Sequence, residues 1–296
     1  MKAKVVIVRA KGIVDTGKID KELAKKVIDK GLGALYDEKS SVEPLRKIFG
    51  RSKSIGIKIN TLAGKMMSSI PEIPFALSDL IISSGKKAEN IIVWDRTNGE
   101  LKDSGYKLNY SGNEIRVFGT DTYGVGYEEE LTEHRNIGSL FSRIQSQLTD
   151  SSISLGILKD HGITGITGGM KNYYGAVHNP NKYHDNHGNP FIADLFSCDL
   201  IKNKNKIIIL DALKVQYHRG PSFHPKYFEM YESLIFGEDP VAVDSVGLKI
   251  IEEIRKKHGL KSLKEEDREP LWLKTASDYG LGESDLKKIE IQEINI

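Results

Sequence analysis

The chain has 296 residues, of which 39% are hydrophobic, and this is enough apolar side chain to bury a sizeable core. Its 43 Lys and Arg residues nearly balance 41 Asp and Glu residues, which argues against nucleic acid as a partner. The single cysteine, Cys198, rules out an internal disulfide and any iron–sulfur cluster held by four thiolates of this chain.

The strand-like run at residues 5–8 begins almost at the first residue, which leaves no room for a secretory signal in the chain as written. No stretch approaches the roughly 18 consecutive apolar residues of a membrane span, so no membrane-spanning helix is expected. We therefore expect a soluble chain, and its compartment stays open because a removed export signal would leave no trace.

Short β-branched runs alternate with helical stretches along the chain. The predicted strands are residues 5–8, 54–60, 91–95, 115–118, 154–158 and 207–210, with an edge strand at 289–291. Helices are predicted over residues 21–30 and 75–84, because Gly31 and Gly85 follow them at the C-cap position. This pattern predicts an α/β fold with a largely parallel sheet and flanking helices, as one domain over residues 1–296 or as two packed lobes, 1–125 and 126–296.

The carboxyl ends of strands face the ligand crevice in sheets of this type. Asn60, Asp95 and Asp211 each fall at such an end. The strand at residues 154–158 likewise delivers the carboxylate of Asp160 and the imidazole of His161. We therefore expect these polar side chains to surround one site.

A glycine-rich turn follows at residues 162–172. Gly168 and Gly169 would let backbone amides approach a ligand, Lys171 would neutralise an anion, and Asn172 closes the turn. The spacing is not that of the phosphate-binding P-loop. A purely structural turn is the alternative interpretation.

Six of the eight histidines, at positions 161, 178, 184, 187, 218 and 224, lie within one quarter of the chain. His184 and His187 have the spacing that places two imidazoles on one face of a helical turn, within reach of one metal ion. The alternative is a polar surface loop. Arg219 could bind a substrate carboxylate or phosphate through its planar fork, or form a structural salt bridge instead.

A series of motifs resembles the family called domain of unknown function 362. They are residues 57–60 (IKIN), 159–161 (KDH), 169–175 (GMKNYYG), 211–212 (DA), 220–221 (GP) and 239–244 (DPVAVD). The resemblance extends from about residue 5 to residue 247. Members often carry a ferredoxin-like cluster module or an export signal, and neither is evident in this sequence.

His161, Lys171 and His187 are also ordered and spaced similarly to functional residues of the lactate racemase family. This looser resemblance implies a nickel pincer cofactor tethered to Lys171, with His161 as an acid/base and His187 as a metal ligand. The histidine-bearing loop that follows an early strand in the racemases is replaced here by residues 95–98 (DRTN).

These patterns favour a metal- or metallocofactor-dependent enzyme that acts on a small anionic molecule, with a divalent metal or a nickel-type organometallic cofactor. The expected site comprises His161, Lys171 and Asp160 as catalytic residues, Asn60, Asp95, Gly168, Gly169, Asn172, Asp211 and Arg219 as cofactor-binding residues, and His184 and His187 as metal ligands. One alternative is a non-catalytic protein that binds a metal or a small anion. The other is a cofactor-free enzyme with His161 as general base and Lys171 stabilising a developing anion.

Overall fold

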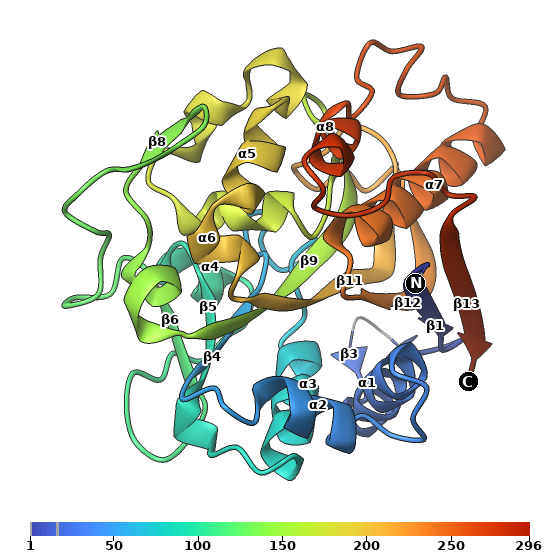
Figure 1. Cartoon of the computed structure of the whole chain (residues 1–296). Helices are drawn as coiled ribbons and strands as arrows, with labels where there is room; N and C mark the ends of the chain where they lie inside the picture. The colour runs from blue at the N-terminus through green and yellow to red at the C-terminus, as the bar shows by residue number, and fades with distance from the viewer. Residues whose placement is uncertain (1, 16–17) are drawn as a thin grey trace.

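The computed structural model describes residues 2–15 and 18–296 and is built around one large sheet (Figure 1). The strands follow the order β13-β1-β12-β11-β9-β4-β5-β6, and β10 pairs with β9 off this path. Their bounds are β1 (Ala3–Arg9), β4 (Ile55–Lys58), β5 (Ile91–Asp95), β6 (Arg116–Gly119), β9 (Ser151–His161), β10 (Gly165–Thr167), β11 (Asn205–Gln216), β12 (Phe228–Gly237) and β13 (Ile289–Asn295). Two small ribbons pair β2 (Val14–Asp15) with β3 (Lys18–Ile19) and β7 (Thr132–His134) with β8 (Ile137–Ser139).

Most neighbouring strands of the sheet are parallel, which confirms the predicted α/β class. The exceptions are β12, which is antiparallel to both β1 and β11, and the short β10 beside β9. The sequence does not predict β12, because the first half of this strand is partly exposed and its second half is fully buried. Its residues therefore follow no single alternating pattern. Strands from both sides of residue 125 belong to this one sheet, and the predicted edge strand is β13, beside β1.

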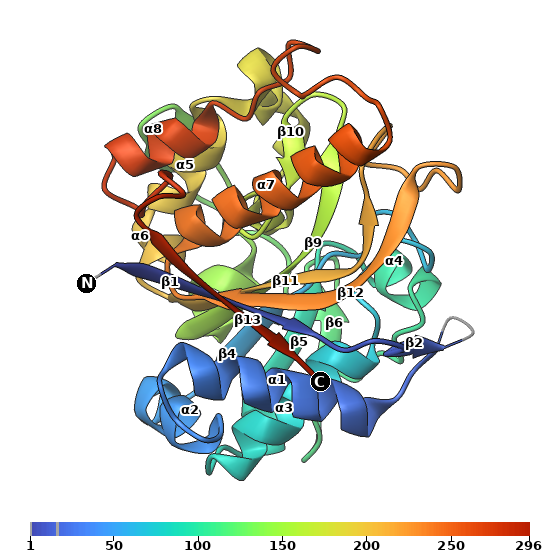
Figure 2. The same cartoon turned by 90° about the vertical axis from the view of Figure 1, so that its right-hand side faces the viewer.

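Helices cover both faces of the sheet (Figure 2). One face packs against α1 (Lys21–Leu35), α2 (Val42–Phe49) and α3 (Glu72–Ser83), and the other against α5 (Phe191–Ser197), α6 (Asp199–Lys202), α7 (Pro240–Lys257) and α8 (Trp272–Asp278). The short helix α4 (Asn98–Asp103) follows β5. Cys198 is buried, and no helix among the described residues is long and apolar enough to cross a membrane.

The predicted end of the first helix at Gly31 is wrong, because α1 continues through this residue to Leu35. A methyl group added at Gly31 would lie 2.3 Å from Cε2 of Phe236 on β12. The glycine therefore allows the helix to approach the sheet rather than ending the helix. Gly85, in contrast, has a φ of +105° directly after α3, as the C-cap prediction required.

Replacement of Gly31 by alanine tests this packing between α1 and the sheet. We expect Gly31→Ala to lower the free energy of unfolding by about 1–3 kcal/mol, because the Phe236 ring has to shift. Gly99→Ala in α4 is the matched control, since its added methyl group has no neighbour within 4 Å and alanine favours a helix. Urea denaturation measures both changes, and equal stabilities for the two variants would contradict the packing argument.

Candidate functional site

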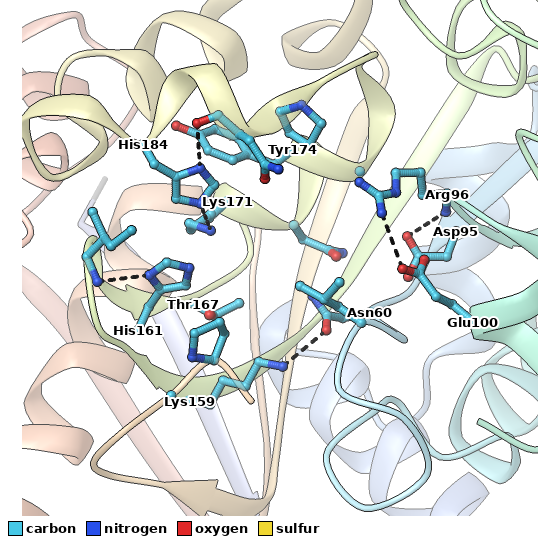
Figure 3. A pocket seen from close by; sticks show the side chains of 18 of the residues that line it. Asn60, Asp95, Arg96, Glu100, Lys159, His161, Thr167, Lys171, Tyr174 and His184 are labelled. Atoms are coloured by element: carbon cyan, nitrogen blue, oxygen red, sulfur yellow. Dashed lines mark hydrogen bonds and ion pairs between the residues drawn. The ribbon is translucent and has the colours of Figure 1, made fainter. Parts of the chain in front are cut away.

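A cavity of about 580 Å³ opens where the carboxyl ends of β4, β5 and β9 meet (Figure 3). Asn60, Asp95 and His161 line it, so the strand ends that the sequence suggested do converge. The opposite wall is formed by the segment from Lys171 to His184. The parallel arrangement of the three strands is what places their polar ends at one edge of the sheet.

A buried ion pair forms one side of the cavity. Nζ of Lys58 lies 2.7 Å from Oδ1 of Asp95, and Oδ2 of Asp95 accepts hydrogen bonds from the backbone N–H and the hydroxyl of Thr61, both at 2.7 Å. The Asn172 amide donates to the Lys58 carbonyl at 2.8 Å and to the Ser154 hydroxyl at 3.0 Å. Asp95 and Asn172 therefore face the cavity as predicted, but their polar groups mainly hold β4, β5 and β9 together.

Two further lysines face the cavity without a carboxylate. Within residues 2–15 and 18–296, the hydrogen-bonding neighbour of Lys159 Nζ is Oδ1 of Asn60, at 3.5 Å, and that of Lys171 Nζ is Nε2 of His184, at 3.1 Å; Lys171 Nζ also lies 4.9 Å from the centroid of the Tyr174 ring. Burial lowers the pKa of Lys159 to about 8. Burial, and then the charge of Lys159, lower the pKa of Lys171 to about 7. An anion placed between these amines would offset the cost of burying their charges.

The ring of His161 is held in one tautomer. Its Nδ1 accepts hydrogen bonds from the backbone N–H groups of Ile163 and Thr164, both at 3.2 Å. The ring proton of the neutral imidazole is therefore on Nε2, which makes this atom a hydrogen-bond donor. Burial, and then the charge of Lys171, lower the pKa of His161 to about 2, so the ring stays neutral.

His184 has the opposite tautomer. Its Nδ1 lies 3.3 Å from the carbonyl oxygen of Asn181, which can only accept, so the proton is on Nδ1. Its Nε2 consequently presents a lone pair to the amine of Lys171. The rings of His161 and His184 are stacked, with centroids 5.2 Å apart. Burial, and then Lys171, lower the pKa of His184.

Thr167 provides a fourth donor beside these groups. Its backbone pairs with that of Lys159 across the β9–β10 hairpin, and its side chain lines the cavity. Its hydroxyl is buried and has no hydrogen-bond partner among the residues that the structure describes. Buried hydroxyls without partners are uncommon, so this one is available to a ligand.

The region that carries these residues matches a known family. Residues 55–249 match the family described as domain of unknown function (DUF362). The chain belongs to this family. No curated protein matches the chain. Among solved structures, a crystal structure of a protein from Thermotoga maritima, determined by the Northeast Structural Genomics Consortium, is 13% identical with a TM-score of 0.42, and the match covers 82% of this chain and 60% of that chain.

The carboxylate of Asp160 in this DUF362 chain lies away from the cavity. Successive side chains of β9 point to opposite sides of the strand. The side chains of Lys159 and His161 face the cavity, so the side chain of Asp160, which lies between them in the sequence, points away from it. It binds Nη1 of Arg268 at 2.9 Å, lies 3.7 Å from Nη1 of Arg255, and accepts from the Gly220 amide at 2.8 Å. The structure therefore places this predicted catalytic residue among structural partners.

Gly168 and Gly169 do not bring backbone amides to a ligand as the sequence analysis suggested. The backbone amides of Gly169 and Met170 donate to the carboxylate of Asp244 at 2.6 and 2.9 Å. A methyl group on Gly168 would lie 2.5 Å from Oδ1 of Asp244, and one on Gly169 would lie 2.3 Å from Cγ2 of Ile208. These glycines allow close packing, and neither lines the cavity.

Three other predicted residues lie outside the cavity lining. Asp211 is buried beside the Leu213 amide, and burial raises its pKa to about 6. The Arg219 guanidinium lies 5.6 Å from the centroid of the Tyr227 ring. The φ of His187 is 57°, so the turn is not helical there, and its Nδ1 lies 3.0 Å from the Ile163 carbonyl oxygen. Metal binding by His184 and His187 stays a prediction, and no three His, Cys, Asp or Glu side chains of the described residues form a metal-binding group.

Several cavity residues were missed by the sequence reasoning. Lys58, Lys159 and Thr167 lie within the motifs at residues 57–60 and 159–161 and within the glycine-rich turn, but they were not predicted to belong to the site. A lysine at or near the end of an otherwise apolar strand was the available signal, because a lysine is rarely buried in a protein unless it is paired. Arg96 and Glu100 lie at the same cavity and carried no comparable signal.

The Asp160 ion pairs are expected to be important for stability. Asp160→Ala should lower the free energy of unfolding by about 1.5–3 kcal/mol, because Arg268 and Arg255 lose one buried countercharge and keep the carboxylate of Glu266. Asp278→Ala is the control, since its ion pair with Lys274 is exposed and should contribute less than about 1 kcal/mol. Denaturant titration distinguishes the two, and similar losses would contradict a structural role for Asp160.

The depressed pKa of Lys171 predicts a pH-dependent stability. Between pH 7 and pH 10.5 the unfolded chain binds more protons at this residue than the folded one, so the wild-type free energy of unfolding rises with pH. Lys171→Met removes this cost and should be a few kcal/mol more stable than wild type at pH 7, with the difference shrinking towards pH 10. Lys274→Met, at an exposed position, is the control. A constant difference between wild type and Lys171→Met across this range would contradict the assignment.

Proposed function

We propose that the cavity binds a small carboxylate and that the protein is an enzyme that acts on it through the amine of Lys171. The observation that carries this proposal is the pair of buried lysines, Lys159 and Lys171, that face one cavity with no carboxylate partner among the described residues. Buried cations without partners are costly and are tolerated mainly at functional sites.

The two lysines have different roles in this proposal. With a pKa of about 8, Lys159 is mostly charged at neutral pH and attracts the anion. With a pKa of about 7, Lys171 is neutral in a large fraction of molecules, and a neutral amine is what a base or a nucleophile requires. The Nε2–H of His161 donates to an oxygen that becomes negative during the reaction, as a neutral imidazole can.

A carboxylate suits the available donors better than a phosphate. Phosphate sites commonly use several backbone amides, but the amides of Gly169 and Met170 are already bound to Asp244. The end of β9 and the adjoining β10 instead offer three side-chain donors to the cavity: Lys159, His161 and Thr167. A planar group with two oxygens matches this small set.

A second candidate follows from the resemblance to lactate racemases that the sequence suggested, and in it a metallocofactor is attached to Lys171. The specific observation is the amine of Lys171 beside Nε2 of His184 on the cavity wall, which fits a tether and a neighbouring ligand. His187 lies outside the lining, so His184 is the better placed of the two predicted ligands. Such a group would supply a Lewis acid next to the bound anion. Intact mass and elemental analysis of protein from its native host, with Lys171→Met for comparison, would detect the attachment.

Calorimetric titration with pyruvate and lactate tests the leading proposal. Lys159→Met should weaken binding at least about tenfold, because a charge pair in a partly buried site contributes more than about 1.4 kcal/mol. Affinity for wild type should fall as the pH rises above about 8, where Lys159 loses its proton. Lys274→Met should bind as wild type does. Equal affinities for wild type and a correctly folded Lys159→Met would overturn the proposal.

A further inference from the structure

We propose that Lys171 forms an imine with the keto group of a small 2-oxo acid whose carboxylate is held by Lys159. This inference rests on the proposed function, because it requires the cavity to bind a small carboxylate. It adds the substrate class and a covalent step, and it is argued from the positions of four groups around the cavity: the two lysines and the two stacked imidazoles.

Lys171 has the surroundings of a nucleophilic amine. Its Nζ lies 3.1 Å from Nε2 of His184, and the hydrogen bond from Nδ1 of His184 to the Asn181 carbonyl keeps the lone pair on that Nε2. Nε2 can therefore accept the proton that the amine loses when it attacks a carbonyl carbon.

His161 is placed to bind the oxygen of the keto group. Its two backbone donors fix the ring proton on Nε2, and its ring is stacked on that of His184, with centroids 5.2 Å apart. One imidazole thus presents a lone pair and the other presents an N–H on the same side of the cavity as Lys171 (Figure 3). Addition of an amine to a carbonyl needs one group of each kind.

The anchor for the carboxylate adjoins these groups. Lys159 lies two positions before His161 on β9, so both side chains point to the same face of the strand. The free hydroxyl of Thr167 comes from the position paired with Lys159 on β10. In a 2-oxo acid the keto carbon is bonded directly to the carboxylate carbon, which matches an amine next to an anion-binding lysine.

The step balances without a further reactant. The lone pair of Lys171 Nζ forms a bond to the keto carbon, and the π electrons of the C=O bond move to the oxygen. His184 takes one proton from the attacking nitrogen and passes it to this oxygen, which gives a neutral adduct with a hydroxyl group. The nitrogen lone pair then forms the C=N bond as the C–O bond breaks, and the second proton of the nitrogen passes through His184 to the leaving oxygen, so that water and a neutral imine result. Nothing is oxidised or reduced.

Reductive trapping tests the proposal. Protein whose intact mass shows an unmodified Lys171 is incubated with pyruvate and sodium cyanoborohydride, which reduces an imine to a stable secondary amine. We expect one adduct whose mass gain equals pyruvic acid less one oxygen atom, located at Lys171 by peptide mapping. Lys171→Met should lose this adduct, Lys274→Met should keep it, and His184→Gln should form it at least about tenfold more slowly. Lactate has no keto group and should compete without forming an adduct.

The outcomes separate this inference from the proposed function. Pyruvate that binds calorimetrically in a Lys159-dependent way but gives no adduct, or gives one spread over surface lysines, would overturn the imine and leave the anion site standing. Absence of binding by both pyruvate and lactate would overturn the proposed function together with the imine. An adduct that persists in Lys171→Met would assign the reaction to another amine and equally contradict the inference.

Discussion

The geometry of the cavity depends on how the end of β9 is held. Asp160, Arg268 and Arg255 form a buried ion cluster on one side of this strand, and the Arg268 guanidinium also donates to the His161 carbonyl at 3.2 Å. Because side chains alternate along a strand, fixing Asp160 on one side directs Lys159 and His161 to the other. The indole N–H of Trp272 donates to the Thr164 carbonyl at 3.0 Å, which steadies the loop whose amides set the tautomer of His161.

This support comes from outside the part of the chain that defines the family. The cavity residues lie within residues 55–249, whereas Arg255, Arg268 and Trp272 follow that region. The sheet is likewise completed from outside it, by β1 and β13 at one edge. The matched region therefore supplies the side chains that face the cavity. The residues that follow it supply the ion pairs and hydrogen bonds that hold the end of β9 in place.

The buried charges at and beside the cavity differ in whether they have a countercharge. Lys58 is paired with Asp95, and Asp160 is paired with Arg268 and Arg255, which also bind Glu266. Lys159 and Lys171 have no such countercharge among the described residues, and burial depresses the pKa of both. The buried Lys58–Asp95 and Asp160–arginine pairs are thus satisfied, whereas two lysines that line the same cavity are not, which is the pattern expected of a functional site.

The sequence by itself determined the α/β class, most strands of the sheet and the convergence of Asn60, Asp95 and His161, because these follow from local periodicity and from the geometry of parallel strands. Only the tertiary structure decided which polar groups remain free. Asp160 is bound by Arg268, which lies 108 positions away, and the Gly169 amide by Asp244, which lies 75 positions away. The tautomers of the two imidazoles and the unpaired state of the two lysines likewise depend on contacts between distant segments, and no local pattern encodes such contacts.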